Sequence, residues 1–271
     1  MQSGNIKAGN FNVYYERHGK GDAVLLLHAG LLDQSMWEEQ VKSLSVQYEV
    51  ITADLPFHGK TTGIDTSLLV ADMIKILLDS LHLQKVSIVG LSMGAASAQD
   101  FITAYPDRIN KAVLISAGIN GYEKDHPYDS IIIGFFTTFQ KALVDKDEKK
   151  AAIEFTKTWA EGIYRKGDSL KTPVSQYVYK TALNTIQTHK VAGWPLLQEH
   201  PTAYEALATL HMPVLVINGD KDLPSITETS DYLGKNISGA KHVVMKDVAH
   251  MLNIEKPDEL NKLLLDFLKS K

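Results

Sequence analysis

A serine between two glycines is the part of this chain best suited to chemistry. Residues 90–94 are Gly-Leu-Ser-Met-Gly, with a β-branched apolar run before them and small helix-forming residues after them. In such a strand–turn–helix context, the serine lies at the apex of a sharp turn with its hydroxyl exposed at a helix N-terminus. Ser92 is therefore predicted to be a nucleophile. Glycine is expected to be required at positions 90 and 94, because a side chain at either position would collide with neighbouring backbone. The alternative is a glycine-rich turn with an incidental serine.

A serine hydroxyl needs a base, and the base needs a group that orients it. Histidine suits this role because its ordinary pKa is near neutral. Among the ten histidines, His250 follows the last predicted strand, so it should reach the same sheet edge as Ser92. Asp220 and Asp222 follow the preceding predicted strand, and Asp247 lies near His250. The residues alone do not separate these three acids.

Short runs of Val, Ile and Leu alternate with helix-like segments along the chain. Near-continuous apolar runs are typical of parallel strands that have helices on both faces. Such runs predict strands at 23–28, 49–53, 86–89, 112–116 and 214–218. Alternating apolar and polar residues predict a further strand at 11–17, and a short apolar run predicts a last strand at 242–245. Apolar residues at helical spacing predict helices at 67–81, at 93–105 and from Pro257 onward. Asp65 or Thr66 is the expected cap of the first helix. This alternation predicts an α/β fold with a doubly wound, mostly parallel sheet.

The interval 121–209 breaks the alternation because it contains no good strand candidate. Its apolar residues recur at helical spacing instead. We interpret it as a helical cap, with residues 1–120 and 210–271 forming the core; the alternative is that these helices simply extend the core. Aromatic residues of the interval are candidates for an apolar substrate pocket, although aromatic residues at this spacing also form cores. These candidates are Phe135, Phe136, Phe139, Trp159 and Trp194.

The order serine, acid, histidine, together with Gly-x-Ser-x-Gly, resembles the α/β-hydrolase fold family, and the resemblance covers essentially the whole chain. Residues 28–30 are similar to the family's His-Gly-x loop, and residues 219–222 to its Gly-x-x-Asp. Residues 54–59 are similar to its Asp-x-x-Gly-His-Gly turn, with Phe57 in place of a glycine. Residues 249–257 are similar to its histidine loop and the helix that follows.

The resemblance implies roles for particular residues. Ser92, Asp222 and His250 would be the catalytic residues, with Asp222 preferred over the other two acids. The backbone N–H groups of Gly30 and Met93 would form the oxyanion hole. The interval 121–209 would be the helical cap that the family inserts after its sixth strand. His28 and His58 are expected to be structural.

The resemblance also implies a reaction class. We expect a serine hydrolase that cleaves a carboxylic ester or lactone of a small, apolar substrate through an acyl-enzyme, with no cofactor or metal. The serine argues against the family's dehalogenases and epoxide hydrolases, which use aspartate as nucleophile. Met251, where C–C hydrolases commonly carry tryptophan, weakens that option. A C–C or amide hydrolase of the same fold, or a ligand-binding protein with little turnover, remains an alternative hypothesis.

Composition bounds the class of protein. The 271 residues are 44% hydrophobic and 22% charged, which suits one large globular core, and the net charge of −4 gives no basic footprint for nucleic acid. The absence of cysteine excludes disulfides, thiolate nucleophiles and cysteine-based zinc sites. No apolar stretch is long enough to cross a bilayer. We expect a cytoplasmic monomer or homodimer with a small-molecule substrate, no nucleic-acid partner and no membrane insertion.

Overall fold

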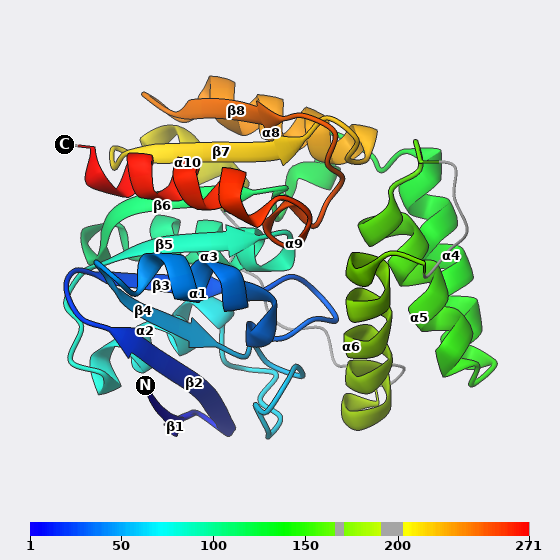
Figure 1. The fold of residues 1–271 in the computed structure, drawn as a ribbon, viewed down its shortest axis with the longest axis horizontal. Helices are drawn as coiled ribbons and strands as arrows, with labels where there is room; N and C mark the ends of the chain where they lie inside the picture. The colour runs from blue at the N-terminus through cyan, green and yellow to red at the C-terminus, as the bar shows by residue number, and fades with distance from the viewer. Residues whose placement is uncertain (166–170, 191–202, 271) are drawn as a thin grey trace.

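An eight-stranded sheet forms the centre of the computed structural model, which describes residues 1–165, 171–190 and 203–270 (Figure 1). The strand order is β1-β2-β4-β3-β5-β6-β7-β8. The two pairs that involve β2 are antiparallel, and every other neighbouring pair is parallel. The strands are β1 (Gln2–Ala8), β2 (Phe11–Gly19), β3 (Ala23–Leu27), β4 (Glu49–Ala53), β5 (Val86–Leu91), β6 (Ile109–Ile115), β7 (Val214–Gly219) and β8 (Lys241–Met245). The predicted α/β fold with a mostly parallel sheet is confirmed.

Ten α-helices occur in the described residues. They are α1 (Glu38–Leu44), α2 (Val70–Ser80), α3 (Met93–Ala104), α4 (Ser130–Val144), α5 (Glu148–Thr156), α6 (Pro173–His189), α7 (Ala203–Ala206), α8 (Pro224–Asn236), α9 (Leu252–Glu255) and α10 (Pro257–Lys269). A π-helical turn, η4 (Lys157–Glu161), continues α5. Short 3-10 turns cover Gln34–Trp37, Pro106–Arg108, Tyr122–Lys124 and Leu207–Thr209.

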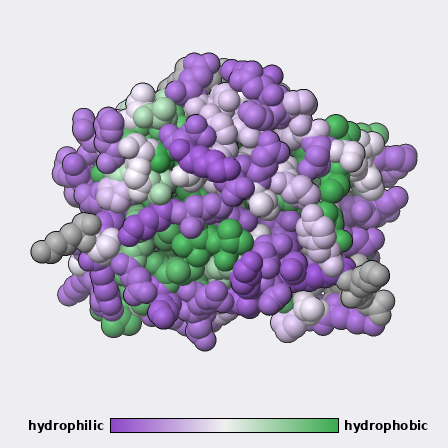
Figure 2. All heavy atoms as spheres, turned by 90° about the horizontal axis from the view of Figure 1, so that it is seen from above, coloured by the Kyte–Doolittle hydropathy of each residue, from purple (hydrophilic) through white to green (hydrophobic). Residues whose placement is uncertain are grey.

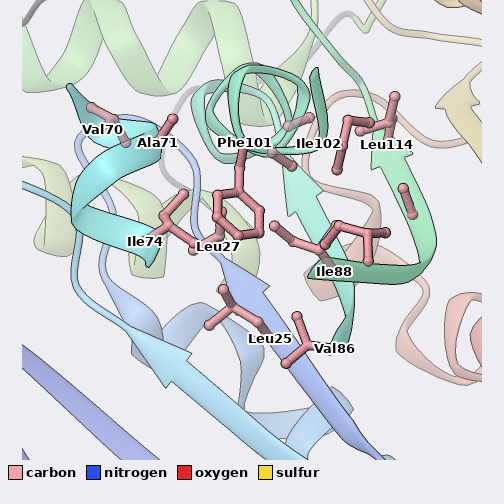
Figure 3. Close-up of a cluster of buried hydrophobic side chains, with 14 of the residues drawn as sticks. Leu25, Leu27, Val70, Ala71, Ile74, Val86, Ile88, Phe101, Ile102 and Leu114 are labelled. Carbon is pink, nitrogen blue, oxygen red and sulfur yellow. The ribbon is translucent and has the colours of Figure 1, made fainter. Parts of the chain in front are cut away.

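Helices cover both faces of the sheet. On one face, Leu25, Leu27 and Ile88 of the central strands pack against Ile74 of α2 and Phe101 of α3 (Figure 3). On the other face lie α1 and α10, in front of the sheet in Figure 1. Every residue of β3, β5 and β7 is buried. Burying one Leu, Ile or Phe side chain contributes about 1.5–3 kcal/mol, so these continuous apolar runs become the central strands.

Two details differ from the sequence-based expectations. Strand β1 was not predicted, because it is polar and mostly exposed, and it is held by its antiparallel pairing with β2. The predicted cap of the helix at 67–81 is wrong. Helix α2 begins at Val70, and Leu69 at its N-cap supplies no side-chain hydrogen bond. Asp65 instead accepts hydrogen bonds from the N–H groups of Ser67 and Leu68, which closes the turn before the helix, and Thr66 does not cap it either.

Every helix or strand that the structure describes between β6 and β7 is a helix. Helices α4, α5 and α6 stand beside the sheet, at the right of Figure 1. Most of their buried apolar residues, among them Ala151, Phe155 and Val178, belong to the same apolar cluster as the sheet face under α1 and α10. These helices are therefore joined to the sheet through a shared apolar cluster. The division into core and cap remains a prediction.

The outer surface carries mostly hydrophilic residues in the view from above, where they surround a hydrophobic area near the centre (Figure 2). No helix in the described part of the chain has the length and apolar character needed to cross a membrane.

Candidate active site

Ser92 lies at the turn between β5 and α3, with φ 56° and ψ −117°. This left-handed backbone conformation is uncommon for a residue with a side chain, and such strain is concentrated at functional sites. A Cβ on Gly90 would collide with the carbonyl oxygen of Gly94, and a Cβ on Gly94 would collide with that of Leu27. The turn therefore has room only for glycine on both sides of Ser92, as the sequence predicted.

His250 lies against Asp222 in the buried interior. Its Nδ1 is 3.0 Å from both carboxylate oxygens of Asp222, and the two side chains are 2% and 1% exposed. The acceptor character of the carboxylate places the hydrogen on Nδ1, so the neutral ring presents Nε2 as an acceptor. That Nε2 is buried and has no hydrogen-bond partner among the described residues. Ser92 does not hydrogen-bond to it, and contacts of this kind often tighten only when substrate binds.

The rival acids lie elsewhere. Asp220 accepts a hydrogen bond from the N–H of Asp247 at 2.7 Å. Its other carboxylate oxygen faces Lys221 at 3.5 Å and Lys246 at 3.7 Å. Of the three acids considered in the sequence, Asp222 is the one that meets His250.

Gly30 and Met93 lie next to each other beside Ser92. A Cβ placed on Gly30 would be 3.9 Å from the Cβ of Met93. The backbone N–H groups of Gly30 and Met93 have no acceptor within the described part of the chain. Two unpaired N–H groups next to a nucleophile could stabilise an oxyanion.

Two buried histidines hold the loop that carries Gly30. His58 Nε2 accepts a hydrogen bond from the N–H of Leu31 at 2.9 Å, and His28 Nε2 accepts one from Leu55 at 2.8 Å. Because both Nε2 atoms accept, the hydrogens lie on Nδ1, which donate to the carbonyl oxygens of Pro56 and Ala29 at 2.8 Å.

Burial lowers the pKa of His28 below its ordinary value of 6.5 and the pKa of His58 well below it. The neutral tautomers fit this direction. Their hydrogen bonds support the structural role expected for both rings.

The turn at 54–59 contains the departure noted in the sequence. Phe57 has φ 63°, the left-handed region that glycine adopts without strain. Its ring is buried and packs edge-on against Phe11, with centroids 5.7 Å apart. Asp54 accepts hydrogen bonds from the N–H groups of Gln34 and Lys60, which fixes the turn on both sides.

Two cavities of about 320 and about 360 Å³ meet at Ser92. The larger cavity is apolar, and His250 and the loop around Gly30 also line it. Among its walls are four of the five aromatic side chains considered in the sequence, Phe135, Phe136, Phe139 and Trp159. Trp194 lies outside the described residues. Sequence reasoning did not place Phe155 in this wall, although its position four residues before Trp159 was the available signal.

The second cavity is more polar and was not predicted. Its walls include loop residues that follow β6 and residues of α8, which no motif connects in the sequence. Its polar side chains include Asn120, Glu123, His126, Asp129, Ser225, Glu228 and Thr229. Among the described residues, no lysine or arginine lines either cavity. No cluster of three or more His, Asp or Glu suited to a metal ion occurs in that part of the chain.

The chain belongs to the alpha/beta hydrolase fold family, whose sequence profile matches residues 22–257. It is 28% identical to a putative non-heme chloroperoxidase of Synechocystis over 98% of both chains. It is 25% identical to a 2-hydroxy-6-oxo-6-phenylhexa-2,4-dienoate hydrolase of Comamonas testosteroni, over 97% of this chain and 93% of that one. A bromoperoxidase from Bacillus anthracis has a similar structure, with a TM-score of 0.80, 27% identity and 99% coverage of both chains. The fold and these relatives identify a member of a hydrolase enzyme family.

Proposed function

We propose that this protein is a serine hydrolase that cleaves a carboxylic ester or lactone of a small, apolar substrate. The observation that carries the proposal is the His250–Asp222 contact, which leaves an unpaired, buried Nε2 in the cavity that Ser92 lines. A hydroxyl on a strained turn that lines the same cavity as such an imidazole is suited to nucleophilic attack on an acyl carbon.

In the proposed mechanism, Ser92 Oγ bonds to the carbonyl carbon of the substrate while its proton passes to His250 Nε2. The C–O bond to the leaving group then breaks, and the same proton moves to the leaving oxygen. A water molecule then attacks the acyl carbon while one of its protons passes to His250 Nε2. The ester bond to Ser92 breaks, that proton returns to Ser92 Oγ, and the acid is released. Asp222 holds the imidazole in the required tautomer and stabilises its charged form.

The oxyanion that forms in both steps needs hydrogen-bond donors that are already in place. The free N–H groups of Gly30 and Met93 would supply them, at about 3 kcal/mol per donor. His28 and His58 would hold the Gly30 loop in position through the bonds described above.

The cavity walls favour an uncharged substrate. The Comamonas relative is named for a dienoate, which is an anion, and burial of an anion calls for a cationic or donor-rich partner. Neither cavity has a lysine or arginine among its described walls. Met251 follows His250 where C–C hydrolases commonly have tryptophan. Both observations favour ester hydrolysis over C–C cleavage. C–C cleavage is retained as the alternative because of the Comamonas relative.

A fluorophosphonate probe and a panel of p-nitrophenyl esters test the proposal together. We expect the probe to label Ser92, the wild type to hydrolyse short apolar esters, and Ser92→Ala to lose both properties. Labelling without ester turnover would point to a C–C or amide hydrolase. A folded protein that is neither labelled nor active would indicate a ligand-binding protein and would refute the proposal.

A further inference from the structure

Trp159 lines both cavities that meet at Ser92. Its indole also packs on His250, with ring centroids 4.5 Å apart and planes at 53°. On its other sides it contacts Phe135, edge-on at 5.5 Å, and the apolar cluster formed by Ile132, Leu223 and Ile226. The indole therefore forms a common wall of the two cavities, next to the residues proposed to do the chemistry.

Trp159 lies on an unusual stretch of backbone that places it against the His250 loop. Trp159 is the middle residue of η4, and π-helical turns are rare and often occur at functional sites. Gly162 follows with φ 73°, and a Cβ there would be 3.0 Å from Ala249 Cβ and 3.1 Å from the carbonyl oxygen of Lys221. Glycine thus lets this turn lie directly against the loop that carries His250.

An ion pair fixes the same turn to the same loop. Arg165 lies 2.5 Å from Glu255 and also donates to the carbonyl oxygen of Asp247. The Glu255 side chain is 8% exposed, and its second oxygen accepts a hydrogen bond from the N–H of Ala249, which precedes His250. Arg165 is exposed and the Glu255 side chain is mostly buried, and together their contacts connect the turn to the His250 loop.

We propose that Trp159 is a specificity-determining residue, which divides the substrate site into an apolar and a polar compartment and limits the size of the apolar group. This inference rests on the proposed ester hydrolysis. Each side of the scissile bond occupies one compartment, with the acyl carbon at Ser92 between them. Met93 and Phe136 also line both cavities, so replacing the indole with a small side chain removes part of the shared wall and gives longer apolar groups room.

The test compares two ester series in wild type, Trp159→Ala and Trp159→Phe. In one series p-nitrophenyl esters run from acetate to decanoate; in the other, acetates carry progressively longer alcohols. Selectivity is the ratio of kcat/KM for the longest ester to that for the shortest. We expect this ratio to rise about tenfold or more for Trp159→Ala in one series, since each accommodated methylene is worth about tenfold or more. Trp159→Phe, which keeps an aromatic wall, should stay within a few-fold of wild type.

Tyr164→Ala is the matched control, because Tyr164 is an exposed aromatic residue five positions later and lines neither cavity. Its selectivity should equal that of wild type. If Trp159→Ala lowers kcat/KM for all esters equally, Trp159 only supports His250 and the inference is wrong. If Trp159→Ala does not fold by circular dichroism, Trp159→Leu takes its place, with an intermediate shift expected and no shift contradicting the inference. A wild type that hydrolyses no ester overturns both this inference and the proposed function.

Discussion

At Phe57, a buried aromatic side chain occupies a backbone conformation that suits glycine. The left-handed region costs a residue with a Cβ about 1–2 kcal/mol. The burial of the ring against Phe11 offsets that cost, because removing a buried Phe side chain costs about 3–5 kcal/mol. The position thus combines local strain with tertiary packing, and the two contributions can be measured separately.

Phe57→Gly and Phe57→Ala should both destabilise the protein, because both remove the ring. Glycine also relieves the strain at φ 63°, so we expect Phe57→Gly to be more stable than Phe57→Ala by about 1 kcal/mol. This order is the reverse of the one found at helical positions. Urea unfolding of the two variants measures the difference. A Phe57→Ala protein that is at least as stable as Phe57→Gly would contradict the strain argument.

Asp222 and Asp220 differ by two positions and form a matched pair for a test of the proposed orienting acid. Asp222→Asn should lower kcat for the best ester about 10⁴-fold with the fold intact, because the amide stabilises the wrong tautomer of His250. Asp220→Asn keeps an oxygen that can accept from Asp247 and should stay within a few-fold of wild type. Steady-state kinetics of both variants decide the matter. Equal activity losses in the two proteins would remove Asp222 from its proposed role.

Among the elements, helix α4 contributes several aromatic walls of the apolar cavity but contains a glycine in its interior. Asp129 caps its N-terminus by accepting from the N–H groups of Ile131 and Ile132. Gly134 is exposed, and a Cβ there would meet nothing within 4 Å. The space beside Gly134 would therefore accommodate a larger side chain.

Gly134→Ala should stabilise the protein by about 0.5–1 kcal/mol, since alanine loses less backbone entropy in a helix. Gly94→Ala should have the opposite effect, because the added Cβ would collide with backbone of β3. Thermal unfolding of the two variants provides the comparison. A lower melting temperature for Gly134→Ala would mean that α4 needs flexibility at this position.

Predictability from sequence differed between elements for physical reasons. Strands β3, β4, β5 and β7 were predicted closely, because a strand buried on both faces must be a continuous apolar run. Strand β1 could not be predicted, because most of its side chains are exposed and its pairing with β2 leaves no apolar pattern in the sequence. The turn around Ser92 was predictable because steric limits leave glycine as the only choice on both sides. The polar cavity was not, because its walls come from segments about a hundred residues apart.

On the scale of the whole molecule, buried neutral histidines connect stability to pH. Burial lowers the pKa of His28 and His58, and also that of the partly buried His242, from 6.5. The unfolded chain therefore binds protons that the folded protein does not. The stabilising contribution is fully present above about pH 6.5 and is lost as the pH falls toward the lowered folded values.

We expect the free energy of unfolding to decrease as the pH falls from about 7.5 to about 5.5, by up to about 1.4 kcal/mol per pH unit for each such histidine. Burial raises the pKa of Asp54 and Glu255, so protonation of these two groups favours the folded state at lower pH and opposes the effect of the histidines. A comparison of two histidine variants separates the contribution of His58 from that of the acids. His58→Asn should flatten the dependence, and the exposed control His211→Gln should leave it unchanged. Urea titrations at each pH measure the free energy of unfolding. An equally steep pH dependence in His58→Asn would exclude His58 as its cause.

The position of the long helical interval has a consequence for how this molecule can diversify. Strands β6 and β7, which flank it, are paired neighbours with Ala112 opposite Val214. The interval leaves the sheet at the carboxyl end of β6 and re-enters at the amino end of its parallel neighbour β7, so a crossover between the two strands is required in any case. Loop-closure entropy grows only slowly with length, so a change in the length of this crossover adds little to its entropy cost. If Trp159 has the role proposed above, changes within this segment alter selectivity while the Ser92 turn is inherited unchanged.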